Sequence, residues 1–245
     1  MRKKLLCALP FLIFILICVR FQCAPSWTVG AAFCHQMPDR SPMFGTAQLP
    51  FCFRCAGLFA GILCALLYSL LRKEDEAMFS VRSIVFLAAA LFFYAIDILN
   101  STTLLDVTIY PDQTHTRFLS GFAAGAGIAG FILPLYRNLF HHEGNRKPSL
   151  LLRLAFQTVC AILFHAAVYA DSTVIEFPLR IILCLSAMIF LILLYSLLIK
   201  AVSLARGSTR SAKSVYLPAA AFALLQIDLL SFAHLQLTAS GLIQF

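Results

Sequence analysis

Long apolar stretches alternate with short polar segments along the whole chain. Seven of these stretches are close to the roughly 17–25 residues with which a helix crosses a bilayer. In lipid, only helices and closed barrels satisfy their backbone hydrogen bonds, so continuous stretches of this length are expected to be helices. We therefore predict an all-α bundle of about seven transmembrane helices, over Leu5 to Val19, Ala56 to Leu71, Ser83 to Leu104, Phe118 to Tyr136, Leu150 to Tyr169, Pro178 to Ile199 and Val215 to Leu235.

The basic residues between these stretches are distributed unevenly. If the N-terminus is cytoplasmic, the outer side carries Arg20, Arg40, Arg54, Arg117 and Arg180, and the other 14 of the 19 Lys and Arg residues lie inside. Cytoplasmic loops are enriched in Lys and Arg, which favours N-terminus in and C-terminus out. The first stretch is interpreted as a retained span, because the small residues of a signal cleavage site are missing after it.

Composition supports the same class. The 245 residues are 61% hydrophobic and 12% charged, about half the charged fraction that is usual in soluble domains. The net charge of +8 lies in the short loops, where it suits anionic lipid headgroups rather than nucleic acid. We expect a single integral membrane domain over 1–245, in the cytoplasmic membrane of a bacterium, with lipids as its surroundings. A partner protein cannot be named.

Candidate chemistry gathers in two short segments on the predicted outer side. Cys34 and His35 stand in the longest outer loop, and Cys52 and Cys55 form a C-x-x-C pair where the second span begins. Thiolate and imidazole are ligands for zinc and other transition metals, which predicts a metal site of these four residues. The same pair also suits a redox-active dithiol. A structural disulfide among these cysteines and Cys23 is the third interpretation.

A second group of polar residues belongs to the third and fourth spans. Asp97 lies within the third span, where an acid is costly and indicates a functional site or a paired charge. One interpretation is a structural ion pair of Asp97 with Arg117. In the other, Asp97, His115, Arg117 and Arg54 are catalytic residues that orient a ligand, act as a base or hold an anion. Glycines at 121, 125, 127 and 130 are expected to let the fourth helix pack closely.

Three strings resemble a known family. They are Cys34-His35-Gln36-x-Pro38-x-Arg40-Ser41, Cys52-x-Arg54-Cys55-x-Gly57 and Arg117-Phe118-Leu119-Ser120-Gly121. Together they resemble the predicted membrane proteins grouped as DUF2085, over residues 33–130. The resemblance implies a multi-pass membrane protein with this cysteine-histidine site and supplies no reaction. The spans over 150–236 lie outside it.

Three functions follow from these features. The first is an outward-facing metal site, with zinc as the expected metal, in an enzyme that acts on a lipid or lipid-linked substrate. The second is a thiol oxidoreductase in which the Cys52/Cys55 pair exchanges electrons with a membrane quinone. The third is a transporter or scaffold without enzymatic activity.

Overall fold

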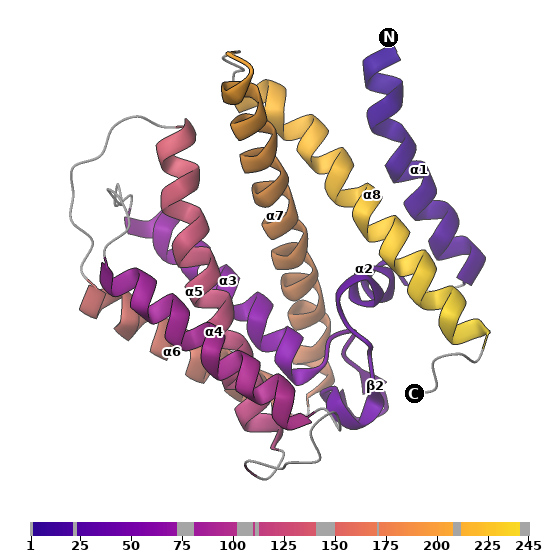
Figure 1. The fold of residues 1–245 in the computed structure, drawn as a ribbon. Coiled ribbons are helices and arrows are strands. Elements are labelled where there is room, and N and C mark those ends of the chain that lie inside the picture. Colours follow the sequence, from indigo (N-terminus) through magenta and orange to yellow (C-terminus); the bar gives the residue numbers. More distant parts are fainter. Residues whose placement is uncertain are drawn as a thin grey trace. The chain divides into compact units, whose positions relative to one another are not determined.

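A computed structural model describes residues 2–21, 24–72, 81–101, 110, 113–140, 150–170, 172–207 and 212–240. Eight α-helices account for most of these residues (Figure 1). A short 3₁₀ turn, Pro38–Arg40, and a small hairpin of β1 (Met43–Phe44) and β2 (Ala47–Gln48) lie between α2 and α3. The helices are α1 (Arg2–Phe21), α2 (Pro25–Phe33), α3 (Phe53–Arg72), α4 (Val81–Ser101), α5 (Thr114–Phe140), α6 (Leu150–Val168), α7 (Thr173–Ala205) and α8 (Ala212–Ala239).

The predicted all-α membrane class is confirmed. Among the described residues, five helices are long and apolar enough to cross a membrane, namely α3, α5, α6, α7 and α8. The first predicted span, Leu5 to Val19, lies within α1. Its part Leu12–Arg20 and the next helix, Pro25–Phe33, are bent by 97° and would make a sixth crossing if they form one span. Pro25 is the reason for a new helix here, because a proline is favourable in the first turn and unfavourable further inside. The third predicted span contains a shorter apolar helix, Ile84–Asn100.

The chain forms two compact units, which we describe separately. The first contains residues 1–41, 48–52 and 180–245. In it, α8 packs along α1 and against α2 (Figure 1). The hydroxyl of Ser231 donates a hydrogen bond of 2.6 Å to the carbonyl oxygen of Thr28, and the Thr28 hydroxyl lies 3.2 Å from Cys18 Sγ. Such hydrogen bonds between helices compensate for the weak hydrophobic drive to associate in lipid.

The second unit contains residues 42–47 and 53–179 and is built around α5. Two glycines of α5, Gly121 and Gly125, face the backbone of α3, and Gly57 and Gly61 of α3 face the backbone of α5. A methyl group on any of the four would overlap a backbone carbonyl oxygen of the other helix. The close packing expected of the glycines at 121 and 125 is therefore found, and their missing side chains explain it.

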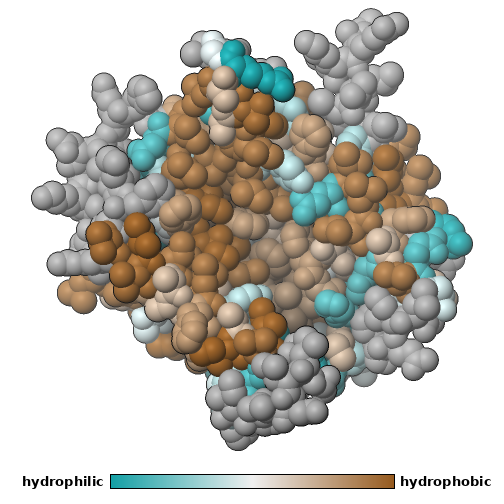
Figure 2. Space-filling view, in the orientation of Figure 1, coloured by the Kyte–Doolittle hydropathy of each residue, from teal (hydrophilic) through white to brown (hydrophobic). Residues whose placement is uncertain are grey.

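The outer surfaces of the helices are apolar. The helices differ in how much of their apolar stretch is buried against the rest of the protein, with 67% buried in α5 and only 17% in α6. The exposed remainder of α6 includes Leu151, Val159, Ile162 and Leu163. The space-filling view shows the same predominance of hydrophobic side chains over the described residues (Figure 2). A surface of this kind is stable in hydrocarbon and would associate in water.

Candidate functional site

The cysteine-containing loop runs from the end of α2 to the first turn of α3. At its start, α2 ends where the Cys34 N–H donates a hydrogen bond of 2.8 Å to the Gly30 carbonyl oxygen. At its end, Cys52 directly precedes α3, and Cys55 follows three residues later on the continuous chain, within the first turn of that helix. The loop thus brings together cysteines from two segments that are 18 residues apart in sequence.

The sulfur atoms of Cys34, Cys52 and Cys55 all lie within 4.8 Å of one another. No disulfide joins these three cysteines in the structure, and Cys23, the other cysteine of the disulfide interpretation, lies outside the described residues. Cys34 is buried, and its Sγ accepts hydrogen bonds from the backbone N–H of Cys52 at 3.1 Å and of Gln36 at 3.4 Å. These two hydrogen bonds fix the position of the Cys34 sulfur atom in the loop, and contacts of this kind orient a metal ligand.

Gln36 organises the loop around this sulfur. Its side-chain amide donates to the carbonyl oxygens of Trp27 at 3.1 Å and Pro50 at 3.3 Å, and its own carbonyl oxygen accepts a 2.7 Å bond from the Gln48 amide. Its backbone has a φ of 56°, which is uncommon for a residue other than glycine and marks a position held by its surroundings. Sequence reasoning assigned Gln36 no role, because neither its backbone angle nor its partners can be read from one sequence.

The three sulfur atoms are near enough to share one tetrahedral metal ion. Zinc binds thiolate at about 2.3 Å, which places two sulfur ligands about 3.8 Å apart. Because the sulfur atoms lie within 4.8 Å of one another, binding would require them to approach by at most about 1 Å. A set of three thiolates matches the soft-ligand preference of zinc and copper(I) and excludes hard cations such as magnesium.

His35, the fourth predicted ligand, does not belong to this group of three. Its side chain is exposed, and its ring lies edge-on to that of His234, with 6.2 Å between the ring centroids. The adjacent positions of Cys34 and His35 explain the difference, because the chain is extended at Cys34, and neighbouring side chains of extended chain point in opposite directions. A closed Cys₃His site therefore stays a prediction without geometric support.

Asp97 forms an ion pair in the second unit, and both of its carboxylate oxygens have partners. Its Oδ2 lies 2.6 Å from Nε of Arg54 and accepts a 3.1 Å hydrogen bond from Ser120, while its Oδ1 accepts a 2.7 Å bond from the Tyr110 hydroxyl. Arg54 Nη2 also donates to the backbone oxygen of Asp97 at 3.0 Å. The ion pair thus involves Arg54, which sequence reasoning had placed with the anion-binding residues, and its contacts are those of a structural clamp.

The other two predicted catalytic residues have different surroundings. Nδ1 of His115 lies 2.9 Å from Nε2 of His165, and its ring stacks on Tyr169 with 4.4 Å between the centroids. The Tyr169 hydroxyl donates to Thr114 at 2.7 Å. Arg117 is buried in the first turn of α5. The described contacts therefore join Asp97 with Arg54, and His115 with His165 and Tyr169, as two clusters rather than one catalytic set.

A further buried acid, Asp228 in α8, was not among the residues predicted from the sequence. Its side chain is 1% exposed, and neither carboxylate oxygen has a hydrogen-bond partner among the described residues. It lines a mostly apolar pocket of about 380 Å³ between α1 and α8, together with Ile13, Leu16 and Ile17 and with one cationic residue, Arg20. The signal was present in the sequence, because an acid inside an apolar run indicates a functional or paired site.

Fold and site together define a polytopic helical membrane protein with a cluster of three cysteines beside one of its spans. The model of a family described as predicted membrane protein (DUF2085) matches residues 34–131. Uncharacterized protein MJ1492 of Methanocaldococcus jannaschii is 30% identical over 118 residues, which are 48% of this chain and 72% of that protein. The chain belongs to the DUF2085 family, and the resemblance seen in its cysteine motifs is confirmed. No solved structure matches it.

Proposed function

We propose that the protein binds one zinc ion through Cys34, Cys52 and Cys55. The observation that carries this proposal is the convergence of three cysteine sulfur atoms within 4.8 Å, with two backbone N–H groups donating to one of them. Gln36 would act as a positioning residue, because it links the loop to α2 and Pro50. Outer-sphere contacts of this kind fix the ligand geometry and tune metal affinity.

Three protein ligands leave one position of a tetrahedral zinc for water or a substrate. A site with an open position can activate water, which is the basis for proposing hydrolysis of a lipid or lipid-linked substrate. Bound metal would supply the nucleophile, and the apolar helices around the loop would admit the hydrocarbon part of the substrate. Under the proposed topology of seven spans with the N-terminus inside, this chemistry faces the extracytoplasmic side.

Metal analysis of the full-length protein, purified in detergent, tests the metal site. We expect about one zinc per chain and a loss of most of it in Cys52→Ala, because a ligand is removed. Cys160→Ala is the matched control, since this half-buried cysteine of α6 is not in the sulfur cluster, and it should keep the metal. Wild-type protein without zinc, or Cys52→Ala with full zinc content, would contradict the proposal.

The second candidate is the thiol–quinone oxidoreductase, favoured by the proximity of the same sulfur atoms. In that case two thiols would lose two electrons and two protons to a quinone, forming a disulfide and a quinol. Alkylation after acid quench distinguishes the two functions. A cysteine pair that changes between thiol and disulfide with the redox state of the membrane supports the oxidoreductase, and one that stays reduced and metal-bound supports the zinc site.

A further inference from the structure

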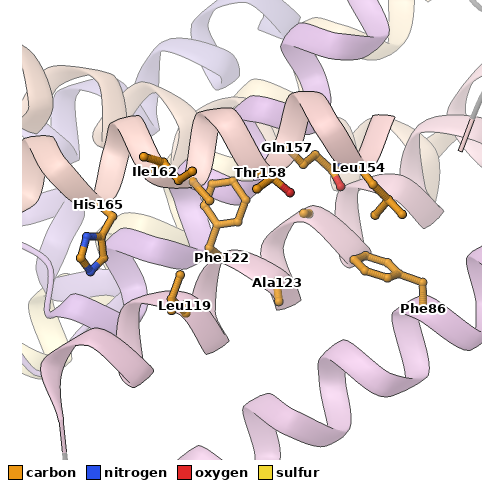
Figure 3. Close-up of a pocket in the computed structure, with 11 residues that line it drawn as sticks. Phe86, Leu119, Phe122, Ala123, Leu154, Gln157, Thr158, Ile162 and His165 are labelled. Carbon is orange, nitrogen blue, oxygen red and sulfur yellow. The ribbon is translucent and has the colours of Figure 1, made fainter. Parts of the chain in front are cut away.

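An apolar pocket lies in the second unit, between α4, α5 and α6. It has a volume of about 490 Å³, within the range of about 300–1,000 Å³ that is typical of small-molecule sites. Its walls are mostly apolar, including Phe86 from α4 and Phe122 from α5. In Figure 3, His165 lies at one end of the pocket and Phe86 at the other, with Gln157 and Thr158 of α6 between them.

Gln157 is the polar group in this pocket that lacks a partner. Its side chain is 5% exposed, and its Nε2 has no hydrogen-bond partner among the described residues. A buried amide donor that remains unsatisfied costs free energy, and in hydrocarbon water does not supply the acceptor. The Nε2 atom is itself covered by protein, so a ligand can reach it only when the Gln157 side chain turns toward the pocket. Such a ligand would be apolar over most of its surface and carry an oxygen acceptor near Gln157.

The depth of Gln157 selects among membrane molecules with these properties. The residue stands seven positions after Leu150 and 11 before Val168, so it lies on the order of 10 Å from one end of α6 and 16 Å from the other. The ester carbonyls of a phospholipid remain near the headgroups, whereas this donor lies within the hydrocarbon layer of about 30 Å. A quinone carries its carbonyl oxygens on a flat apolar ring and can enter that layer completely.

The aromatic walls favour the same ligand. Phe86 and Phe122 offer ring faces and edges on two sides of the pocket, and flat rings pack well against such side chains. Thr158, next to Gln157, presents a second polar side chain to the pocket. His165 follows Gln157 by eight residues, about 12 Å along the helix, so it lies too far away to bind the same carbonyl. His165 lies at the end of the pocket toward which an isoprenoid tail would extend.

We propose that the pocket between α4, α5 and α6 binds an isoprenoid quinone, with one ring carbonyl accepting a hydrogen bond from Gln157. Phe86 and Phe122 enclose the ring, and the tail lies along Leu119 and Ile162. The proposal rests on neither the sulfur atoms nor a bound metal. A quinone bound here would be the electron acceptor of the oxidoreductase. The quinone site is also compatible with cysteines that hold zinc.

Binding of a short-tailed quinone to the detergent-purified, full-length protein tests this site. The probes are a decyl-substituted benzoquinone and decylbenzene, which has the same tail and ring but no carbonyl oxygens. We expect the wild type to bind the quinone about tenfold more tightly than decylbenzene, and Gln157→Leu to lose that preference by losing affinity for the quinone alone. Equilibrium dialysis measures both ligands.

Two further variants control the result. Gln226→Leu removes a glutamine of α8 that accepts a bond from Tyr195, and it should leave quinone affinity unchanged. Ala123→Phe fills the pocket and should abolish binding of both probes. The proposal is overturned if the wild type does not prefer the quinone, if Gln157→Leu binds it equally well, or if co-purified phospholipid occupies the pocket and quinone does not displace it. Because zinc content is measured separately, failure here leaves the metal site untouched.

Discussion

Two acids, Asp97 and Asp228, are each 1% exposed within apolar helices, yet their surroundings differ completely. Asp97 in α4 has an arginine at 2.6 Å and hydroxyl groups at 2.7 and 3.1 Å. Asp228 in α8 has no hydrogen-bond partner for either oxygen among the described residues. Burial alone therefore does not tell what an acid in a membrane helix does. The number and kind of its partners decide this.

The two surroundings imply different roles. A charge in hydrocarbon is tolerated when an opposite charge and hydrogen bonds compensate for the lost solvation, as Arg54, Tyr110 and Ser120 do for Asp97. An acid without such partners lacks this compensation. Asp97 thus joins α3, α4 and α5 through its ion pair and hydrogen bonds, whereas neither carboxylate oxygen of Asp228 has a hydrogen-bond partner among the described residues.

The largest effect is expected where the clamp is broken. Asp97→Ala should lower the free energy of unfolding by about 3–5 kcal/mol, because it leaves the Arg54 guanidinium partly buried without its counter-charge. Asp228→Ala is the matched control and should cost much less, since no hydrogen bond of its carboxylate is lost. Equilibrium unfolding in mixed micelles with increasing SDS measures both. Equal losses in the two variants would show that the comparison is wrong.

A smaller effect is expected from the helix packing that supports the clamp. The Cβ of Gly121→Ala would overlap the carbonyl oxygen of Arg54, a backbone atom that cannot move alone, so we expect a loss near the upper end of about 1–3 kcal/mol. At Gly127 the nearest atom is a terminal methyl carbon of Leu87 at 3.2 Å, which can rotate away. Gly127→Ala should therefore be near neutral in the same SDS titration. A reversed order would mean that α3 and α5 do not pack backbone to backbone.

Sequence reasoning located the helices and the cysteine cluster but not the partners of the buried charges. Apolar stretches of bilayer length predict helices. Cys34, Cys52 and Cys55 stand at the two ends of one short loop, and the short loop keeps them near one another. The partner of Asp97 could not be predicted in the same way, because both Arg54 and Arg117 were candidates. The rotation of the helices about their axes, which a single sequence does not specify, brings Arg54 into contact with Asp97. For the same reason His115 was grouped with Asp97 instead of His165.

The smallest effect on stability, and the most informative for the comparison, is expected at Asp228. Asp228→Leu replaces a carboxyl without a hydrogen-bond partner among the described residues by a side chain that suits Ile13, Leu16 and Ile17. Although Arg20 also lines this pocket, stability should be unchanged or should rise by about 1 kcal/mol. The same SDS titration measures it, with Asp97→Leu as the destabilised counterpart. A loss of more than about 2 kcal/mol at Asp228 would mean that the purified protein holds a partner for this acid, and Asp228 would then join Asp97 as a clamp.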